Sequence, residues 1–265
     1  MPIIEVLGTG FFVGNDSALH VITAKHVITD NPLSGDEKYA IVFNNGQSIK
    51  ILATLHIRVA VDYDIAACRV DRTDFPDAVL LAIGRRDPSL NEDLFSYEYS
   101  STRIERTPGH THVCFEPYAH KGHIVRSFDS TYPEKVKTAS YLTSFPALQG
   151  ASGAPLIAAT LSKKSFAVVG VTVANVEMHL QPAQVVEIHD GNSYRESTSY
   201  FLPYGKALAR SVVAHCLEGM QVPFTYAEDL EAAAENRRWW RRLWSYALVA
   251  VRRFRAVMAS CRISP

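Results

Sequence analysis

The sequence predicts an all-β fold followed by a helical C-terminal extension. Short runs rich in β-branched and aromatic residues recur through most of the 265 residues, and turn-forming groups such as N-D-S, N-P-L-S-G-D and N-N-G separate them. Turns at this spacing indicate antiparallel barrels rather than βα units. A helical pattern becomes prominent only near the end of the chain. With 47% hydrophobic residues, the chain is long enough to bury a sizeable core.

The predicted strands fall into two groups. Those within residues 3–83 are I-I-E-V-L, G-F-F-V, H-V-I-T-A, Y-A-I-V-F, S-I-K-I-L-A-T-L-H-I and A-A-C-R-V. The polar segment from Gly84 to Thr107 is expected to link two barrels. The second group begins near Thr111 with T-H-V-C-F-E, H-I-V-R-S-F, K-V-K-T-A-S-Y-L, A-P-L-I-A-A and F-A-V-V-G-V-T-V-A, and its last strand lies near Tyr200.

These groups suggest two domains. The first covers residues 1–222, with barrels at roughly 1–84 and 108–205 and a short helix ending at about 219. The second is a basic helical tail at 223–265.

A candidate nucleophile, Ser152, lies in the run L-Q-G-A-S-G-A-P. A serine hydroxyl needs an adjacent base and a preformed site for the oxyanion before it can attack a carbonyl. Gly150 can adopt a positive φ, so the N–H groups of Gly150 and Ser152 are expected to form that oxyanion site. Gly153 and Ala154 are expected to leave room for substrate. Gly-Ser-Gly runs are also common in plain loops and turns, so this motif needs partners elsewhere in the chain.

Two such partners occur upstream. His26 lies in V-I-T-A-K-H-V-I, which is interpreted as a strand that ends at the histidine, and it is the candidate general base. Asp64 opens another apolar strand in D-Y-D-I-A-A-C-R-V and is the candidate orienting carboxylate, although Asp62 could also serve. The chain order His, Asp, Ser is one of the orders known for such triads.

The segments T-A-K-H-V, D-I-A-A-C-R-V and G-A-S-G-A-P resemble the histidine, aspartate and serine motifs of chymotrypsin-fold (trypsin-like) serine proteases. G-T-G-F-F-V-G and S-Y-F-L-P-Y-G-K-A-L are similar to segments of the HtrA branch, and no PDZ domain is expected here. The resemblance covers about residues 5–219 and implies two six-stranded antiparallel β-barrels with the active site between them. Ala151 stands where secreted members carry an aspartate that pairs with a newly cleaved N-terminus, so we expect no such activation switch.

The resemblance also implies positions for substrate selection. Pro146 would lie at the floor of the main specificity pocket, and Val173, Ala174 and Asn175 would form one wall. Because none of these residues is acidic, a small or medium apolar P1 side chain is expected rather than Arg or Lys. The alternative is that these residues belong only to the barrel core. The polar stretch from Glu177 to Ser199 is expected to be a long loop that covers or gates the site.

Composition and charge bear on partners and location. The formal net charge is zero, and no nucleic-acid partner is expected. The N-terminal run M-P-I-I-E-V-L-G lacks the pattern of a secretory signal, so a cytoplasmic location is expected. The cysteines are widely spaced, which favours buried free thiols in a reducing compartment. They are Cys68, Cys114, Cys216 and Cys261.

Neither a cofactor nor a metal ion is expected. Four histidines form H-x-H and H-x-x-H pairs that could suggest a metal, but no cysteine or carboxylate pattern nearby completes a ligand set. They are expected to be surface residues, and a role beside the active site stays open. They are His110, His112, His120 and His123.

The tail carries acids in its first turns and arginines later, as the helix dipole favours. An apolar stripe at helical spacing lies beside the arginines and is too short to span a bilayer. We weigh three roles for residues 226–262: docking on the catalytic domain or on a second copy in a homo-oligomer, binding a membrane surface, or binding a partner protein. The stripe comprises Trp240, Leu243, Trp244, Ala247, Val251, Phe254 and Met258.

Together these features predict a serine endopeptidase that carries out limited proteolysis of a partner protein. The alternative is a non-catalytic interaction module that keeps the trypsin fold and uses its basic helical tail.

Overall fold

The computed structural model describes residues 6–15, 17–34, 38–43, 48–51, 56–100, 102–107, 110–114, 116–130, 136–189 and 192–235. Most of the predicted first strand, I-I-E-V-L, lies outside the described residues, as do the tail beyond residue 235, with its apolar stripe, and Cys261.

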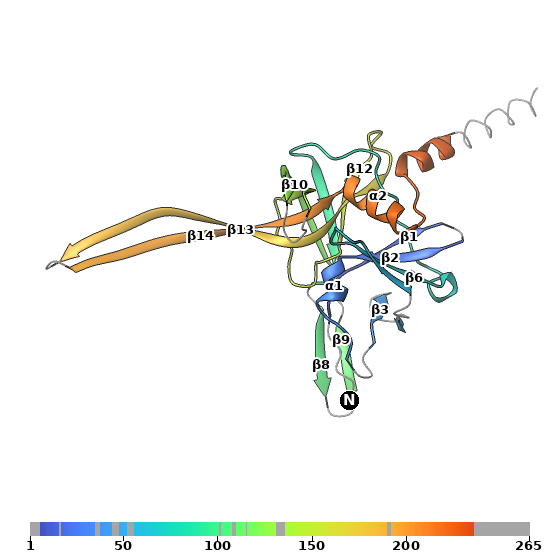
Figure 1. Ribbon diagram of the computed structural model, residues 1–265, viewed down its shortest axis with the longest axis horizontal. Coiled ribbons are helices and arrows are strands. Elements are labelled where there is room, and N and C mark those ends of the chain that lie inside the picture. Colours follow the sequence, from blue (N-terminus) through green and yellow to red (C-terminus); the bar gives the residue numbers. More distant parts are fainter. Residues whose placement is uncertain are drawn as a thin grey trace, which may run out of the picture.

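The N-terminal half is built from antiparallel strands. Strands β1 (Phe11–Gly14), β2 (Leu19–Thr23), β6 (Ala66–Val70) and β5 (Ile57–Val59) form a four-stranded sheet in the order β1-β2-β6-β5 (Figure 1). Strands β3 (Ala40–Phe43) and β4 (Ser48–Ile51) pair beside it as a two-stranded sheet. The predicted strand S-I-K-I-L-A-T-L-H-I is therefore divided between β4 and β5.

The C-terminal half is a closed barrel with the strand order β10-β11-β14-β13-β12-β7. A separate hairpin of β8 (Arg103–Thr107) and β9 (His110–Cys114) lies between β7 and β10 in the sequence. The helix α2 (Arg210–Gly219) follows the last strand. The barrel strands are β7 (Asp93–Glu98), β10 (Tyr118–Ser130), β11 (Thr138–Thr143), β12 (Pro155–Ala159), β13 (Phe166–His189) and β14 (Asn192–Ala209).

The prediction of an all-β fold with a C-terminal helix is confirmed, but the linker prediction is wrong at residues 93–98. These residues form β7, whose side chains alternate between exposed and buried. Two of the three buried positions are polar, Ser96 and Glu98, and so the strand has no clear hydrophobic pattern in the sequence. The predicted strand T-H-V-C-F-E contributes to the β8–β9 hairpin instead of the barrel.

One hydrophobic core joins the two halves. It includes Ile22 and Ile65 from the N-terminal half and Val171 from the barrel, with Val213 and Leu217 from α2. These five side chains are fully buried. Each contributes about 1.5–3 kcal/mol by burial relative to exposure, so the core fixes the relative position of the loops that it carries.

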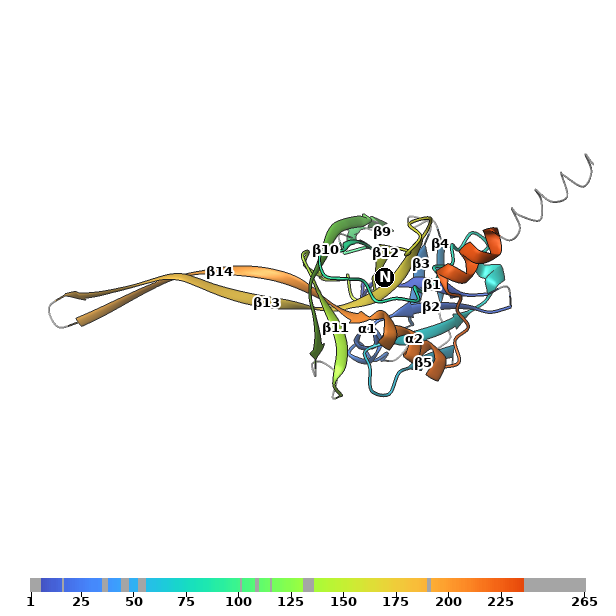
Figure 2. The same ribbon diagram turned by 90° about the horizontal axis from the view of Figure 1, so that it is seen from above.

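Strands β13 and β14 continue beyond the barrel as a projecting hairpin (Figures 1 and 2). Their pairing runs from Gly170↔Ala209 to His189↔Asn192, with register shifts between Thr172 and Ala174 and between Leu180 and Ala183. The expectation of a loop that covers the site is therefore wrong, because the segment forms paired strands that extend away from the barrel. The sequence signal for this hairpin is D-G at residues 190–191, flanked by runs of β-forming residues.

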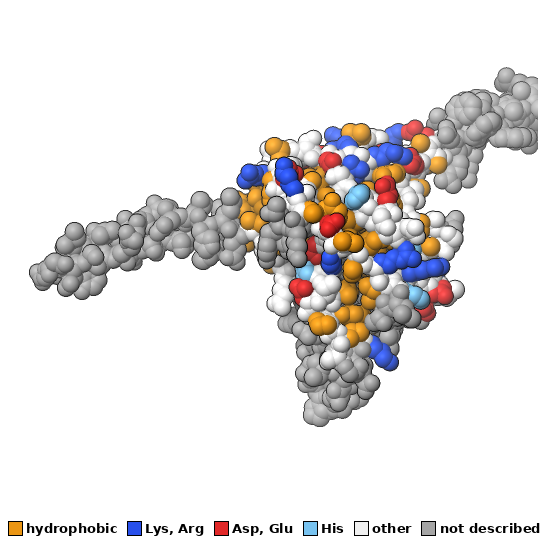
Figure 3. All heavy atoms as spheres, viewed as in Figure 1, with side chains coloured by type: hydrophobic (Ala, Val, Ile, Leu, Met, Phe, Trp, Pro, Cys, Tyr) orange, Lys and Arg blue, Asp and Glu red, His pale blue; other side chains and the backbone are white. Residues whose placement is uncertain are grey.

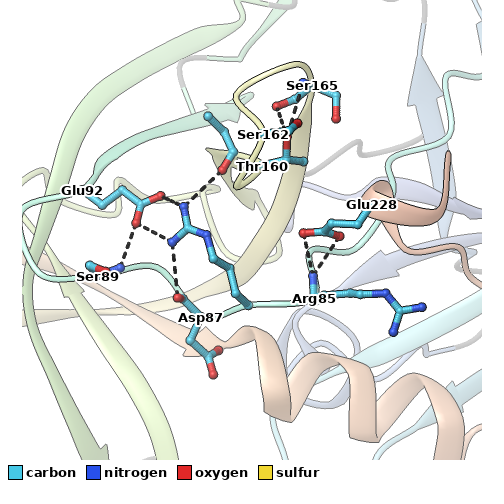
Figure 4. Close-up of polar contacts among 10 residues, drawn as sticks. Arg85, Asp87, Ser89, Glu92, Thr160, Ser162, Ser165 and Glu228 are labelled. Atoms are coloured by element: carbon cyan, nitrogen blue, oxygen red, sulfur yellow. Dashed lines mark hydrogen bonds and ion pairs between the residues drawn. The ribbon is translucent and has the colours of Figure 1, made fainter. Parts of the chain in front are cut away.

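The chain after α2 returns to the segment that connects the two halves. Ile83 pairs with Tyr226, and residues 227–235 are helical. The carboxylate of Glu228 accepts hydrogen bonds from the backbone N–H of Arg85 (Figure 4), and the Arg85 guanidinium lies 4.3 Å from the centre of the Tyr226 ring. The first part of the predicted tail is thus docked on the body of the protein.

Charged side chains are distributed over the surface. Figure 3 shows basic and acidic side chains interspersed with hydrophobic ones on one face of the body, in agreement with the zero net charge. Across the described part of the chain, none of the helices has both the length and the apolar character that a membrane crossing requires.

Candidate active site

The predicted nucleophile lies in the loop between β11 and β12. Ser152 follows Gly150, which has a φ of +91°, and precedes Gly153, which has a φ of +90°. These values lie in a region that residues with a Cβ rarely adopt, so the two glycines allow the sharp turn that presents Ser152.

The candidate base, His26, lies on a short helix rather than at a strand end. Strand β2 ends at Thr23, and α1 covers Lys25–Thr29. The sequence K-H-V-I-T is rich in β-branched residues, which explains the strand prediction. Tertiary contacts favour the helix instead, because the Tyr39 hydroxyl donates to the Ile28 carbonyl at its C-terminal end, at 2.9 Å.

The candidate carboxylate, Asp64, is buried, and both of its oxygens contact His26. Oδ1 accepts the backbone N–H of His26 at 2.8 Å, and Oδ2 accepts Nδ1–H of its ring at 2.6 Å. The other ring nitrogen, Nε2, lies 2.8 Å from Oγ of Ser152. Because a carboxylate can only accept, Nδ1 carries the proton of the neutral ring and the Nε2 lone pair faces the serine. The alternative carboxylate, Asp62, is exposed.

A lysine that the sequence analysis did not single out holds the loop of Asp64. The ammonium group of Lys25 donates to the backbone carbonyls of Ala60, at 2.9 Å, and Val61, at 3.0 Å. Lys25 immediately precedes His26. The first turn of α1 therefore carries both the His26 ring and the lysine that is hydrogen-bonded to the loop leading to Asp64. The sequence signal was the K-H pair itself, but the target of Lys25 is set by the tertiary fold.

The pKa of His26 is raised above its ordinary value. The main cause is the hydrogen bond to Asp64; partial burial of the ring acts in the opposite direction, and the negative charges of Asp64 and Asp30 add to the increase. A more basic ring accepts a proton from a serine hydroxyl more readily.

The backbone N–H groups at the predicted oxyanion site have no competing partner among the described residues. The N–H of Ala151 donates to Leu148 O at 2.9 Å, and the N–H of Gly153 donates to Thr172 O at 2.8 Å. By contrast, the N–H groups of Gly150 and Ser152 donate to no acceptor among the described residues. These two N–H groups are therefore free of competing acceptors in the described part of the chain, and their role in binding a substrate oxygen stays a prediction.

Gly153 and Ala154 have a different role from the predicted one. A Cβ on Gly153 would lie 2.2 Å from Thr9 O and 2.3 Å from Thr23 Oγ1, so this glycine faces the protein interior. Ala154 is fully buried. The expectation that these residues leave room for substrate is wrong, because their small size allows the loop to pack against the N-terminal half.

The predicted specificity residues include two with clear structural roles. Val173 is a buried core residue, which fits the alternative interpretation. The side-chain amide of Asn175 accepts the backbone N–H of Ala147 at 2.7 Å and donates to the carbonyl of Ala147. Asn175 therefore connects β13 to the loop between β11 and β12 that carries Ser152, called the serine loop below. Pro146, next to Ala147, and Ala174 are half-buried.

The histidine pairs do not assemble a metal site in the described part of the chain, where no three His, Cys, Asp or Glu side chains converge. His120 instead contacts the buried carboxylate of Glu98, at 3.0 Å, and stacks on Phe145 with ring centres 5.2 Å apart. The same Glu98 oxygen accepts the hydroxyl of Ser100 at 2.8 Å. The backbone N–H of His123 donates to Ser144 Oγ. The side chains of His110 and His112 lie outside the described residues.

The family described as trypsin-like peptidase domain matches residues 8–171, which is more than half of the chain. No curated protein matched the sequence.

Solved structures match the fold at low sequence identity. The active form of the Rv3671c protease from M. tuberculosis is 18% identical, with a TM-score of 0.51 over 83% of this chain and 76% of that chain. The HtrA-type protease AlgW with a decapeptide is 15% identical, with a TM-score of 0.47 over 81% of this chain and 50% of that chain. The first likeness shows the fold, whereas the second is too low to assign a branch of the family.

Proposed function

Since the chain belongs to the trypsin-like peptidase family, we propose that it is a serine endopeptidase whose nucleophile is Ser152. The observation that carries the proposal is the continuous contact from Asp64 to His26, at 2.6 Å, and from His26 to Ser152, at 2.8 Å. Three residues from separate parts of the sequence meet here at the distances that nucleophilic catalysis requires.

The geometry supports an acyl-enzyme mechanism. Ser152 Oγ attacks the peptide carbonyl while Nε2 of His26 accepts its proton, and Asp64 holds the ring in the required tautomer. The N–H groups of Gly150 and Ser152 stabilise the oxyanion. His26 then donates the proton to the leaving amine, and a water activated by the same nitrogen hydrolyses the acyl-enzyme.

The proposed substrate is a particular partner protein, cut at a few positions after small or medium apolar residues. The residues at the predicted pocket positions, Pro146, Val173, Ala174 and Asn175, supply no carboxylate. A buried acid elsewhere in the barrel, Glu98, is already bonded to His120 and Ser100. A peptide library should show faster cleavage after Val, Ala, Ile or Leu than after Arg or Lys, and dominance of the basic residues would refute this preference.

Covalent labelling tests the proposed mechanism. Wild-type protein should react with a fluorophosphonate probe, and the folded Ser152→Ala variant should not. Folded wild-type protein that fails to react would favour the alternative of a non-catalytic interaction module. If labelling succeeds, mapping of new protein termini produced by wild type and absent with Ser152→Ala identifies the substrate.

We also propose that the protein works in the cytoplasm. Support comes from Cys68 and Cys216, which are free and buried. Burial raises the pKa of the Cys68 thiol to about 11 and that of Cys216 to about 12, so both are poor nucleophiles. Fractionation of cells that express the tagged full chain tests this location, and it also reports any association with membranes through residues 226–262.

A further inference from the structure

We propose that Thr9 is a positioning residue for catalysis, because its hydroxyl and backbone together hold peptide groups of the serine loop in the orientation that catalysis requires. The proposal rests on the proposed function, since it concerns how the same site is kept ready. Ala151, at the centre of the loop, has no polar side chain with which to hold the loop itself.

Thr9 makes two hydrogen bonds to the serine loop. Its hydroxyl donates to the carbonyl of Gly150 at 2.7 Å, and its backbone N–H donates to the carbonyl of Ser152 at 2.9 Å. These are the two residues whose N–H groups form the oxyanion site. Thr9 therefore contacts the loop on the carbonyl side of both.

With these bonds, all but one of the polar groups in three successive peptide groups have hydrogen-bond partners. In the Gly150–Ala151 group, the carbonyl is held by the Thr9 hydroxyl, and the N–H donates to Leu148. In the Ala151–Ser152 group, the carbonyl accepts the N–H of Ala154 at 2.8 Å. In the Ser152–Gly153 group, the carbonyl is held by the backbone of Thr9. Among the described residues, the N–H of Ser152 is the one polar group in this series left unpaired, and its direction is fixed by the groups around it.

Thr9 is itself held from two sides. Its hydroxyl accepts the backbone N–H of Tyr99 at 3.2 Å, just after β7, and its carbonyl accepts the hydroxyl of Thr23 at 2.7 Å. Its exposed fraction is only 4%, so water competes little for these bonds. Through this one residue, the end of β2, the end of β7 and the serine loop are connected.

Close packing leaves little space for a replacement contact. A Cβ on the neighbouring Gly8 would lie 2.8 Å from the carbonyl of Ser152, and one on Gly153 would lie 2.2 Å from the carbonyl of Thr9. When the hydroxyl is removed, the Gly150 carbonyl loses its partner, and its peptide group can rotate because glycine permits other φ and ψ values.

The test compares Thr9→Val, which keeps the shape and removes the hydroxyl, with Thr9→Ser, which restores the hydroxyl. The assays are hydrolysis of a short apolar peptide ester and inhibition by a peptide boronate, whose tetrahedral adduct with Ser152 places an oxygen at the oxyanion site. For Thr9→Val, we expect kcat to fall about tenfold or more, KM to change by less than about twofold, and boronate affinity to fall in parallel with kcat. Thr9→Ser should recover most of both losses.

Thr138→Val is the matched control. Thr138 is a buried threonine at the far end of β11 from the serine loop, and its hydroxyl donates to the carbonyl of Val136 at 2.9 Å. This variant should lose thermal stability comparably while its kcat and boronate affinity stay at the wild-type level.

Wild-type kcat and boronate affinity in folded Thr9→Val would overturn the proposal, as would a Thr9→Ser variant as impaired as Thr9→Val. A fall in kcat without a fall in boronate affinity would show that the effect lies outside the oxyanion site. Failure of the proposed function is distinguishable, because wild type itself would then neither hydrolyse the ester nor bind the boronate covalently.

Discussion

The charge state of His26 is controlled by an element distant in the sequence. Asp64 contacts both the backbone and the ring of His26 and is the main cause of the elevated pKa of the ring, whereas Asp62, two residues earlier, is exposed. The choice between the two carboxylates follows from position, since Asp64 adjoins the strand β6 and is fixed by it.

Exchange of each aspartate for its amide tests this difference. Asp64→Asn should lower kcat about ten-thousandfold, because the amide favours the wrong tautomer of His26. Asp62→Asn should have little effect, and Ser152→Ala and His26→Ala should each cost about a millionfold. Steady-state kinetics on a peptide ester measures these values, and the reverse ranking of the two aspartates would assign the orienting role to Asp62.

The raised pKa of His26 also predicts the pH profile. If the neutral ring is the base, as proposed, kcat/KM should rise with pH through an inflection above the ordinary histidine pKa of about 6.5. The protonated ring is favoured in the folded state, so its contribution to stability is present below about pH 6.5 and is lost as pH rises through the folded pKa. In Asp64→Asn the inflection should move to lower pH, and an unchanged inflection would contradict the assigned cause.

At the scale of elements, Gly153 in the serine loop differs from Gly219 in α2. Gly153 combines a positive φ with three close neighbours in the N-terminal half, whereas a Cβ on Gly219, the last residue of α2, would meet no atom within 4 Å. The first glycine is required by packing, and the second is not.

Gly153→Ala should therefore destabilise the fold by about 1–3 kcal/mol or more. The added Cβ overlaps neighbouring atoms, and the positive φ is unfavourable for alanine. Gly219→Ala is the matched control and should change stability by less than about 1 kcal/mol. Urea unfolding of the two variants measures the difference. Equal stabilities would show that the loop can move away from Thr9 and Thr23.

The carboxylate of Glu231 connects the start of the C-terminal helix to the barrel. Glu231 accepts hydrogen bonds from the hydroxyls of Thr160 (2.6 Å), Ser162 (2.7 Å) and Ser165 (2.5 Å) in the turn between β12 and β13. These bonds lower the pKa of Glu231 to about 2. Tyr226 pairs with Ile83, so the helix and the strand before it dock together.

Glu231→Gln should lower the melting temperature at neutral pH. Because the pKa of Glu231 is depressed in the folded state, its ionised carboxylate stabilises the fold at pH values above the ordinary glutamate pKa. This contribution disappears as pH falls toward 2, so the difference in melting temperature between the variant and wild type should shrink below about pH 4.5. Asp229→Asn, which loses an exposed ion pair with Arg85, is the control and should have a smaller effect. A melting difference independent of pH would show that the carboxylate charge is not the cause.

The same contacts predict different outcomes for two truncations. A chain that ends at Phe224 lacks Tyr226 and Glu231 and should be less stable, whereas one that ends at Glu235 keeps the described contacts and should match the full chain. Both should hydrolyse peptide esters when folded, because His26, Asp64 and Ser152 lie elsewhere. A folded, monodisperse but inactive truncation would make the tail an activator of the site.

For the molecule as a whole, the sequence predicted the barrel strands with clear apolar patterns and the three residues that meet at the site. It did not predict β7, because Ser96 and Glu98 occupy interior positions in that strand. It also placed His26 on a strand, since local propensity cannot show that Tyr39 stabilises α1 from outside. The roles of Thr9, Asn175 and Gly153 depend on contacts between distant segments, which no local pattern encodes.

Removal of the projecting hairpin should leave the rest of the protein intact. If residues 177–202 are replaced by Asn-Gly, the barrel pairs from Gly170↔Ala209 to Val176↔Tyr204 remain. We expect ester hydrolysis and melting temperature close to wild type, and small-angle scattering should show a maximum dimension shorter by about 45 Å, from about 3.3 Å per strand residue. Loss of ester hydrolysis in the folded variant would show that the hairpin supports the site.

Attachment through two paired strands gives this hairpin mechanical properties that a single-chain linker lacks. A flexible linker lets its ends rotate independently, but a ribbon joined at both β13 and β14 resists twisting about its long axis. The far end of the paired strands is consequently held at a set spacing from the barrel, in a restricted range of orientations. The base of this ribbon, at Asn175, is hydrogen-bonded to the loop that carries Ser152.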